Sequence, residues 1–179
     1  DFAALDPFFA WMQRAQQRML MVLPLLPTTP GDPSPYSTRS AFGLNPLFIH
    51  LEWMPEGVAW TDAEKKQLAE AKASPTIRYD LVFPLKTAAL ERAFATFEGQ
   101  GATARRTEFE RFCSEQAFWL ENYALYSSLS EAFDAKPWWE WPKGLSTRDP
   151  KALDVARKEH AKRTRYHQWL QWVCDSQWK

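Results

Sequence analysis

Apolar and polar positions alternate with a helical period along most of this chain. Apolar residues recur three and four positions apart in residues 7–17 and again in residues 85–98, which predicts two amphipathic helices. The same pattern predicts four further helices, over residues 61–73, 103–116 and 117–133 and from residue 150 to about residue 178.

Residues at the predicted helix ends favour helix initiation or termination. Thr61 and Glu64 form the S/T-x-x-E pattern of a capping box, and Ser74-Pro75 ends the helix that it begins. Pro follows Asp6 and again Asp149, which predicts an N-cap followed by the first helical residue at both places. The side chains expected to be buried are Phe8, Trp11, Met12 and Ala15, then Leu85, Ala89, Leu90, Ala93, Phe94 and Phe97, and then Phe109, Phe112, Leu120, Tyr123, Leu129 and Phe133.

One segment departs from the helical pattern. Met19–Leu23 is a short unbroken apolar run before Pro24, which favours a strand buried on both faces, as in a parallel sheet. A parallel strand needs partners, and the rest of the sequence shows helices and loops. Either a short partner strand lies within the chain or the partners lie outside it. The absence of an initial Met agrees with the second interpretation.

The loop after this predicted strand is rich in proline. It holds Pro24, Pro27, Pro30, Pro33 and Pro35 before it ends at Pro46, and Tyr36 lies in the middle among Ser34, Ser37, Thr38 and Ser40. Because proline fixes φ, this composition predicts a preordered loop that holds the tyrosine ring in place.

Composition and charge exclude several classes of protein. The 179 residues carry 22 basic and 22 acidic side chains, so nothing forces a basic face that binds nucleic acid. No apolar run is long enough to cross a membrane, so we expect a soluble, cytoplasmic protein. Cys113 and Cys174 have no nearby partner in the sequence, and we favour two free, buried thiols over a disulfide between them.

Candidate catalytic and metal-binding patterns are weak. His160, His167 and Cys174 recur every seven residues, but seven helical residues rise about 10 Å, too far for one shared metal ion, so we predict structural roles and no metal site. Pairs of acidic residues, which could serve as catalytic carboxylates, lie on predicted helices rich in Lys and Arg. On such helices carboxylates typically belong to a solvated face. No G-x-S-x-G motif and no glycine-rich phosphate loop is present. Trp138–Pro142 is either a packing cluster, which we favour, or a sugar-stacking platform.

The loop and its neighbours resemble glycoside hydrolase family 77, the 4-alpha-glucanotransferases. That family carries the patterns QVLPLxPT, GDSPY and SAFAxNPLLI in this order, and further patterns downstream with the same spacing. The matching residues are Val22–Thr28, Gly31–Tyr36, Ser40–Ile49, Tyr79 with Val82, Lys86 and Leu90, Phe112 with Trp119–Leu125, Trp138–Pro142, and His167 with Trp169–Trp172 and Gln177–Trp178. The resemblance covers the chain almost from end to end.

Two prolines depart from the family pattern. Pro33 is inserted between Asp32 and Ser34, and Pro30 stands where many members have a tyrosine linked to a secondary glucan-binding surface. Leu20 and Met21 replace the usual Trp-Gln.

The resemblance implies an α/β fold. The chain would be the N-terminal portion of a (β/α)8 barrel, which needs about 250 residues, with its first strand followed by a large, mostly helical inserted subdomain. It implies three parts: residues 1–30 with the first helix and first barrel strand, residues 31–60 as the substrate loop, and residues 61–179 as the inserted helical subdomain.

The resemblance also implies what this portion does. The family's catalytic carboxylates lie on later strands, so we expect no catalytic residue in this chain, and no cofactor. Tyr36 and Ser34 would bind a maltooligosaccharide or α-glucan near the cleavage point, and Asp32 and Asn45 are further substrate-loop candidates that hold the loop. The expected partner is the remainder of the barrel.

Two other functions stay open on the sequence. The ten tryptophans also suit a non-catalytic glucan-binding module, and the helices also suit an interaction scaffold without any sugar ligand.

Overall fold

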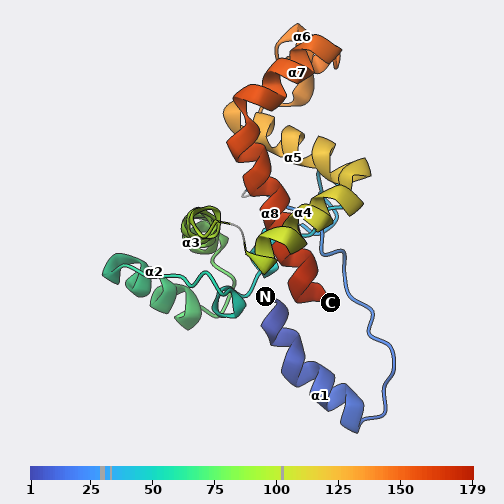
Figure 1. Cartoon of the computed structure of the whole chain (residues 1–179). Helices are drawn as coiled ribbons and strands as arrows, with labels where there is room; N and C mark the ends of the chain where they lie inside the picture. The colour runs from blue at the N-terminus through green and yellow to red at the C-terminus, as the bar shows by residue number, and fades with distance from the viewer. Residues whose placement is uncertain (29–30, 33, 102) are drawn as a thin grey trace. The chain divides into compact units, whose positions relative to one another are not determined.

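The computed structural model describes residues 1–28, 31–32, 34–101 and 103–179, and these residues are mostly helical (Figure 1). Pro30 and Pro33, the two prolines that depart from the family pattern, lie outside the described residues. The α-helices are α1 (Asp6–Arg14), α2 (Asp62–Ala73), α3 (Tyr79–Gly99), α4 (Ala104–Glu115), α5 (Ala117–Ala132), α6 (Lys143–Ser146), α7 (Pro150–Glu159) and α8 (Ala161–Trp178). The short 3-10 helices are η1 (Phe2–Leu5), η2 (Pro46–Phe48), η3 (Leu51–Trp53) and η4 (Trp138–Glu140).

The chain divides into two compact units. Unit 1 comprises residues 1–101 and 173–179, and unit 2 comprises residues 102–172. The last residues of α8 therefore belong to the same unit as the N-terminus. The division by role into residues 1–30, 31–60 and 61–179 is of a different kind and stays a prediction.

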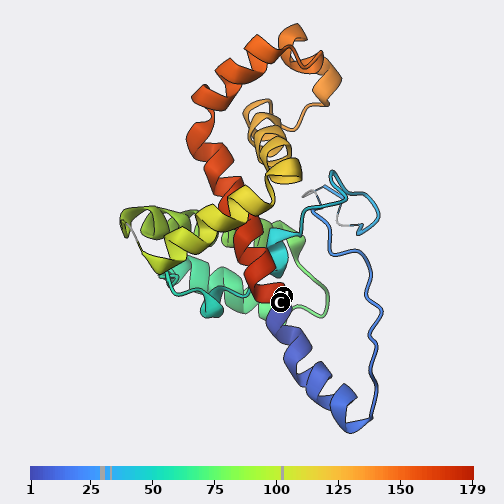
Figure 2. The same ribbon diagram turned by 45° about the vertical axis from the view of Figure 1, so that its right-hand side comes forward.

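The strand predicted at Met19–Leu23 is not observed. No run of described residues forms a strand, and residues after α1 follow an extended path (Figure 2). The side chains of Met19 and Met21 are 87% and 92% exposed, so the prediction that this segment is buried on both faces is wrong for the chain as described. The physical reason is that a β-ladder needs a neighbouring strand, and the described residues supply none.

Helix α1 begins and packs differently from the prediction. η1 leads directly into it, so Leu5, whose φ and ψ are −81° and −24°, is the N-cap, and Asp6 is already helical and does not act as the cap. Only Met12 on the predicted apolar face is buried, whereas Phe8 and Trp11 are exposed. The apolar spacing of α1 is therefore not matched by packing among the described residues.

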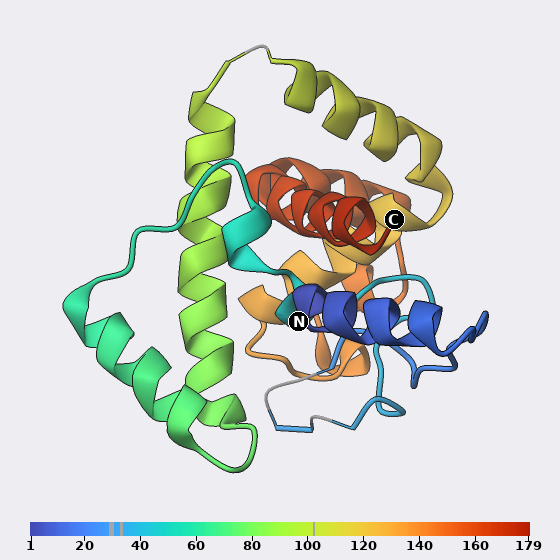
Figure 3. The same cartoon turned by 90° about the horizontal axis from the view of Figure 1, so that it is seen from below.

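Helices α2 and α3 pack against each other in unit 1, with their axes steeply inclined (Figure 3). The predicted capping box is confirmed, since the Thr61 hydroxyl accepts from the backbone N–H of Glu64 and the Glu64 carboxylate accepts from that of Thr61. Glu64 also accepts two hydrogen bonds from Arg92 on α3, and Arg78 donates to Glu70 on α2.

Helix α3 is longer than its sequence pattern predicts. It begins at Tyr79 rather than at Leu85 and contains Pro84. The pattern missed the first turns because Pro84 favours a helix start, whereas the preceding turns already have helical hydrogen bonds to Arg78. The predicted buried face is confirmed in full: Leu85, Ala89, Leu90, Ala93, Phe94 and Phe97 are all buried.

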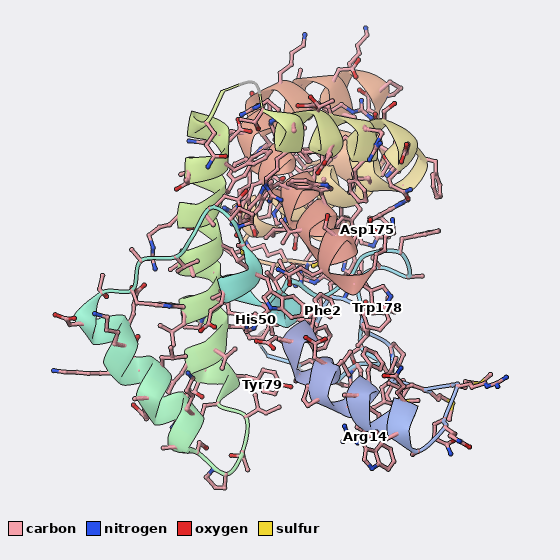
Figure 4. All side chains as sticks on the ribbon, turned by 60° about the horizontal axis from the view of Figure 1, so that its bottom comes forward. Phe2, Arg14, His50, Tyr79, Asp175 and Trp178 are labelled. Atoms are coloured by element: carbon pink, nitrogen blue, oxygen red, sulfur yellow. The ribbon has the colours of Figure 1, made fainter. Side chains whose placement is uncertain are left out.

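The two ends of the chain meet in unit 1. The rings of Phe2 and Trp178 lie 5.7 Å apart between centroids, and Figure 4 shows them side by side with His50 close to them. The last helical turn of α8 thus packs against the first residues of the chain, where Phe2 is buried and Trp178 stays 42% exposed.

Unit 2 is a helical unit with its own core. Leu125, Leu129, Trp141 and Ala156 are buried together, and partly buried Tyr126, Phe133, Leu145 and Leu153 pack against them. Of the side chains expected to be buried in this part, Phe109, Phe112, Leu120 and Leu129 are buried, and Tyr123 and Phe133 are half-buried.

The predicted long last helix is two helices. His160 leaves the helical conformation with φ −101° and ψ 15°, so α7 ends at Glu159 and α8 begins at Ala161. Neither glycine nor proline marks this break, so the sequence pattern alone could not locate it. Asp149 is the N-cap of α7 as predicted, and its carboxylate accepts from the backbone N–H of Ala152.

Both cysteines are free thiols, as predicted, although Cys113 is half-buried and only Cys174 is fully buried. None of the described helices is long and apolar enough to cross a membrane.

Candidate functional site

The loop that carries Tyr36 is shaped by its own polar side chains. The Asp32 carboxylate accepts from the backbone N–H of Ser34 at 3.1 Å, and the Ser34 hydroxyl accepts from that of Tyr36 at 3.4 Å. The carbonyl of Ser34 then accepts from the N–H of Ser37 at 3.1 Å. Successive side-chain and backbone turns of this kind are how Asx and Ser/Thr residues order a loop without secondary structure.

Asp32 acts in this turn as an ionised acceptor. Hydrogen bonds from the Ser37 hydroxyl and from the backbone N–H of Ser34 lower the pKa of the Asp32 carboxyl. A carboxylate committed to two bonds within its own loop organises that loop and is a poor proton donor at neutral pH.

The second half of the loop repeats the device. The hydroxyl of Ser40 accepts from the backbone N–H groups of Phe42 (3.1 Å) and Gly43 (3.3 Å), and the N–H of Ser40 itself donates to Thr38. The hydroxyl-rich composition around Tyr36 therefore orders the backbone on both sides of the ring.

The structure brings Asp32, Ser34 and Tyr36 into one turn. Tyr36 has 72% of its surface accessible, Asp32 is also exposed, and Ser34 is half-buried. The ring of Tyr36 is therefore exposed to solvent, and packing against the described residues does not explain why an aromatic residue stands at this position.

Asn45 lies apart from this turn, at the base of the loop. It is 5% exposed. Its backbone N–H donates to the carbonyl of Leu25 at 2.8 Å, and its side-chain amide donates to the Thr28 hydroxyl at 3.1 Å. The side-chain oxygen caps η2 by accepting from the N–H of Leu47 at 3.0 Å. Asn45 is thus a structural clamp of the loop and does not present a polar group outward.

Two further residues form hydrogen bonds to the segment that follows Asn45, and the sequence did not predict these roles. The Lys86 amine donates to the carbonyls of Leu47 and Ile49, and the Gln177 amide pairs with the backbone of His50. Burial lowers the pKa of the Lys86 amine to about 8. Both residues fall within the recognised sequence patterns, but a pattern names residue types and not the backbone atoms that they reach.

A cavity of about 660 Å³ lies in unit 1 beside the base of the loop. Pro35 and Asn45 line it from the loop, and Lys86 and Tyr79 line it from α3. Most of the wall is apolar and comes from Leu23–Leu26, Leu47, Phe48, Trp60, Leu68, Ile77 and Val82. An apolar wall with a few polar groups is typical of a binding cavity or of a surface that packs against further protein.

The tryptophan cluster divides between packing and exposure. Trp141 is buried, contacts the rings of Tyr126 and Phe133, and donates from its indole N–H to the carbonyl of Lys136 at 3.0 Å. Trp138 and Trp139 are 49% and 64% exposed. The packing interpretation therefore applies to Trp141 and is wrong for the other two.

Among the described residues, no group of three or more His, Cys, Asp or Glu side chains is arranged to hold a metal ion. Several acidic side chains form ion pairs with basic side chains of neighbouring helices, such as Glu64 with Arg92 and Glu131 with Arg163.

Comparison with known proteins decides which family these features come from. The model of glycoside hydrolase family 77, described as 4-alpha-glucanotransferase, matches residues 1–179. The chain belongs to this family. The family 77 relatives include the 4-alpha-glucanotransferases of Thermus thermophilus, 34% identical over 171 residues, and of Synechocystis, 33% identical over 172 residues. Each alignment covers 96% of this chain.

The chain spans about a third of the length of these family 77 relatives, 33% of the Thermus protein and 34% of the Synechocystis protein. A solved structure, the amylomaltase from Streptococcus agalactiae in complex with acarbose, matches the fold with a TM-score of 0.76. That match covers 96% of this chain and 34% of the amylomaltase, at 23% sequence identity. The helical units described above therefore have the fold of one third of an amylomaltase.

Proposed function

We propose that the full-length polypeptide to which this chain belongs transfers segments of α-1,4-glucan between maltooligosaccharides. The observation that carries the proposal is the family 77 match over residues 1–179. The names of the relatives, and the acarbose bound to the amylomaltase of similar fold, support an α-glucan as the substrate.

The proposed chemistry proceeds with retention of configuration. A carboxylate attacks the anomeric carbon, a covalent glycosyl-enzyme forms, and the hydroxyl of an acceptor sugar rather than water resolves it. We expect the catalytic carboxylates outside this chain, on later strands of a (β/α)8 barrel. Met19–Leu23 would be the first strand of that barrel, where neighbouring strands would cover its exposed side chains.

This portion would supply substrate binding. The exposed ring of Tyr36 suits stacking against a glucose unit, because a sugar face is apolar and an aromatic ring is flat. The Ser34 oxygen accepts from the backbone N–H of Tyr36, so its own O–H is able to donate to a sugar hydroxyl. Asp32 and Asn45 would hold the loop from within.

Disproportionation of maltotriose tests this function. The full-length enzyme should release glucose and form longer maltooligosaccharides, and residues 1–179 alone should release none. Glucose release by the isolated chain would contradict the location of the carboxylates, and a full-length protein inactive on maltotriose and on longer maltooligosaccharides would contradict the function itself.

A glucan-binding role without catalysis is the second candidate, favoured by one observation. Trp138 and Trp139 present two exposed indoles whose centroids lie 5.7 Å apart at an interplanar angle of 83°. Titration of tryptophan fluorescence with maltoheptaose tests it: a saturable change in the isolated chain that is lost in Trp139→Ala supports binding at these indoles. No response to any glucan in either the isolated chain or the full-length protein would instead favour an interaction scaffold.

A further inference from the structure

The segment of residues 45–50 is fastened by side chains that come from distant parts of unit 1. The Lys86 amine on α3 donates to the carbonyl oxygens of Leu47, at 2.5 Å, and of Ile49, at 2.6 Å. From the end of α8, Gln177 accepts from the backbone N–H of His50 at 2.7 Å and donates to its carbonyl at 3.0 Å. These side chains thus satisfy backbone groups that a regular helix or sheet would otherwise satisfy.

The first residue of this segment closes the neck of the Tyr36 loop. Asn45 bonds to Leu25 through its backbone and to Thr28 through its side chain, so the two ends of the loop meet there. Whatever fixes residues 45–50 therefore fixes one end of the loop that carries Ser34 and Tyr36.

We infer that Lys86 and Gln177 are positioning residues of the glucan-binding loop: they hold residues 45–50 against α3 and the end of α8, and through Asn45 they hold Tyr36 at the substrate. This inference rests on the proposed function for its consequence, since it identifies what orients the residue expected to bind glucose. In this arrangement both side chains bind backbone atoms of residues 47–50.

The geometry explains why these residue types are used. Lysine has three N–H donors on a flexible stem, so one amine reaches two carbonyls that are two residues apart. A glutamine amide has an NH2 donor group and a carbonyl acceptor side by side, which matches the C=O and N–H of a single residue. Methionine at position 86 keeps the apolar stem but leaves both carbonyls without their donor.

Hydrogen exchange in the full-length enzyme tests directly whether Lys86 holds residues 45–50 in place. In Lys86→Met, the backbone N–H groups of Asn45 and residues 47–50 should exchange at least tenfold faster, with exchange in α5 unchanged. The matched control is Lys66→Met, the same substitution at an exposed position on α2, which should alter neither region. Unchanged exchange in residues 45–50, or equal acceleration throughout the protein, would overturn the inference.

A double-mutant cycle with Tyr36 separates positioning from general stability. Lys86→Met should lower kcat/KM for maltotriose by about tenfold in the wild-type background and by less than threefold when Tyr36→Ala is already present, because the loop then has no ring to orient. Equal effects in both backgrounds would show that Lys86 does not act through Tyr36, and would overturn the positioning role.

Gln177→Leu provides a second, independent variant, with Gln67→Leu on exposed α2 as its control. Gln177→Leu should also accelerate hydrogen exchange in residues 45–50, and its effect on kcat/KM should also shrink when Tyr36→Ala is present. If Lys86→Met fails to fold, these two measurements on Gln177→Leu test the inference. A wild-type enzyme without transferase activity would contradict the proposed function alone. The exchange experiment needs no substrate, so it would still test whether Lys86 and Gln177 hold residues 45–50.

Discussion

The side chains of Asn45 and Thr28 are hydrogen-bonded across the neck of the loop, with 3.1 Å between the amide nitrogen and the hydroxyl oxygen. These two residues are 17 positions apart, and the loop between them carries Ser34 and Tyr36. Closing a loop at its base reduces the conformations open to every residue within it.

Replacement of Asn45 should therefore destabilise the protein. Asn45→Ala removes the bond to Thr28 and leaves the N–H of Leu47 without its acceptor, so we expect the free energy of unfolding to fall by about 1–3 kcal/mol. Asn122→Ala is the matched control, since Asn122 is exposed and its side-chain oxygen accepts from Arg148, and it should change stability by less than about 0.5 kcal/mol. Urea unfolding measures both, and similar losses would deny Asn45 a special role.

Replacement of Tyr36 should affect activity and spare stability. In the full-length enzyme, Tyr36→Ala should lower kcat/KM for maltotriose by at least tenfold while the melting temperature changes little, because the ring is exposed and buries little apolar area. Tyr36→Phe keeps the ring and should retain most of the activity. A loss of several kcal/mol in stability, as for a core aromatic, would instead make Tyr36 a packing residue.

Lys86 should give stability a distinct pH dependence. Its pKa falls from 10.5 when unfolded to about 8 when folded, so between these values the unfolded state binds more protons and stability rises with pH. From pH 7.5 to 9 the wild-type protein should gain about 1 kcal/mol relative to Lys86→Met. Subtracting the stability of Lys86→Met at each pH cancels the contribution of the Cys113 and Cys174 thiols. The control variant Lys66→Met should show the same pH dependence as the wild type. A flat difference between wild type and Lys86→Met would place the folded pKa near its ordinary value.

Gly144 and Ala152 approach too closely for a larger side chain. A Cβ atom at position 144 would lie 2.8 Å from the Cβ of Ala152, so Gly144→Ala should force α6 and α7 apart and cost about 1–3 kcal/mol. Gly99→Ala is the control, because a Cβ there meets nothing within 4 Å and should be neutral or slightly stabilising. Thermal unfolding measures both, and Ala152→Gly should restore part of the loss in Gly144→Ala. Equal melting temperatures for the two alanine variants would show that α6 and α7 accommodate the methyl group.

The helical parts of the fold were predictable because their signals are local. The capping box at Thr61 and Glu64 satisfies backbone donors within a single turn, and the apolar face of α3 follows from a 3.6-residue period. Family membership was likewise accessible, because the patterns around Ser34–Tyr36 and Trp138–Pro142 are continuous in sequence.

The errors arose where a distant or missing neighbour determines the conformation. Met19–Leu23 has the composition of a buried strand, but without a second strand among the described residues it is extended and exposed. The break at His160 has no local marker, and the separation of buried Trp141 from exposed Trp139 depends on which helices pack beside each ring.

The sequence by itself determined the family, the N-caps of α2 and α7 and the buried face of α3, since these depend on spacing along the chain. Only the tertiary structure decided that Asn45 is buried at the base of the loop, and that Lys86 and Gln177 reach the backbone of residues 45–50. Hydrogen bonds to backbone atoms leave no trace in residue type at the accepting position, because every residue has a carbonyl oxygen, and so the folded chain alone reveals which of them are held.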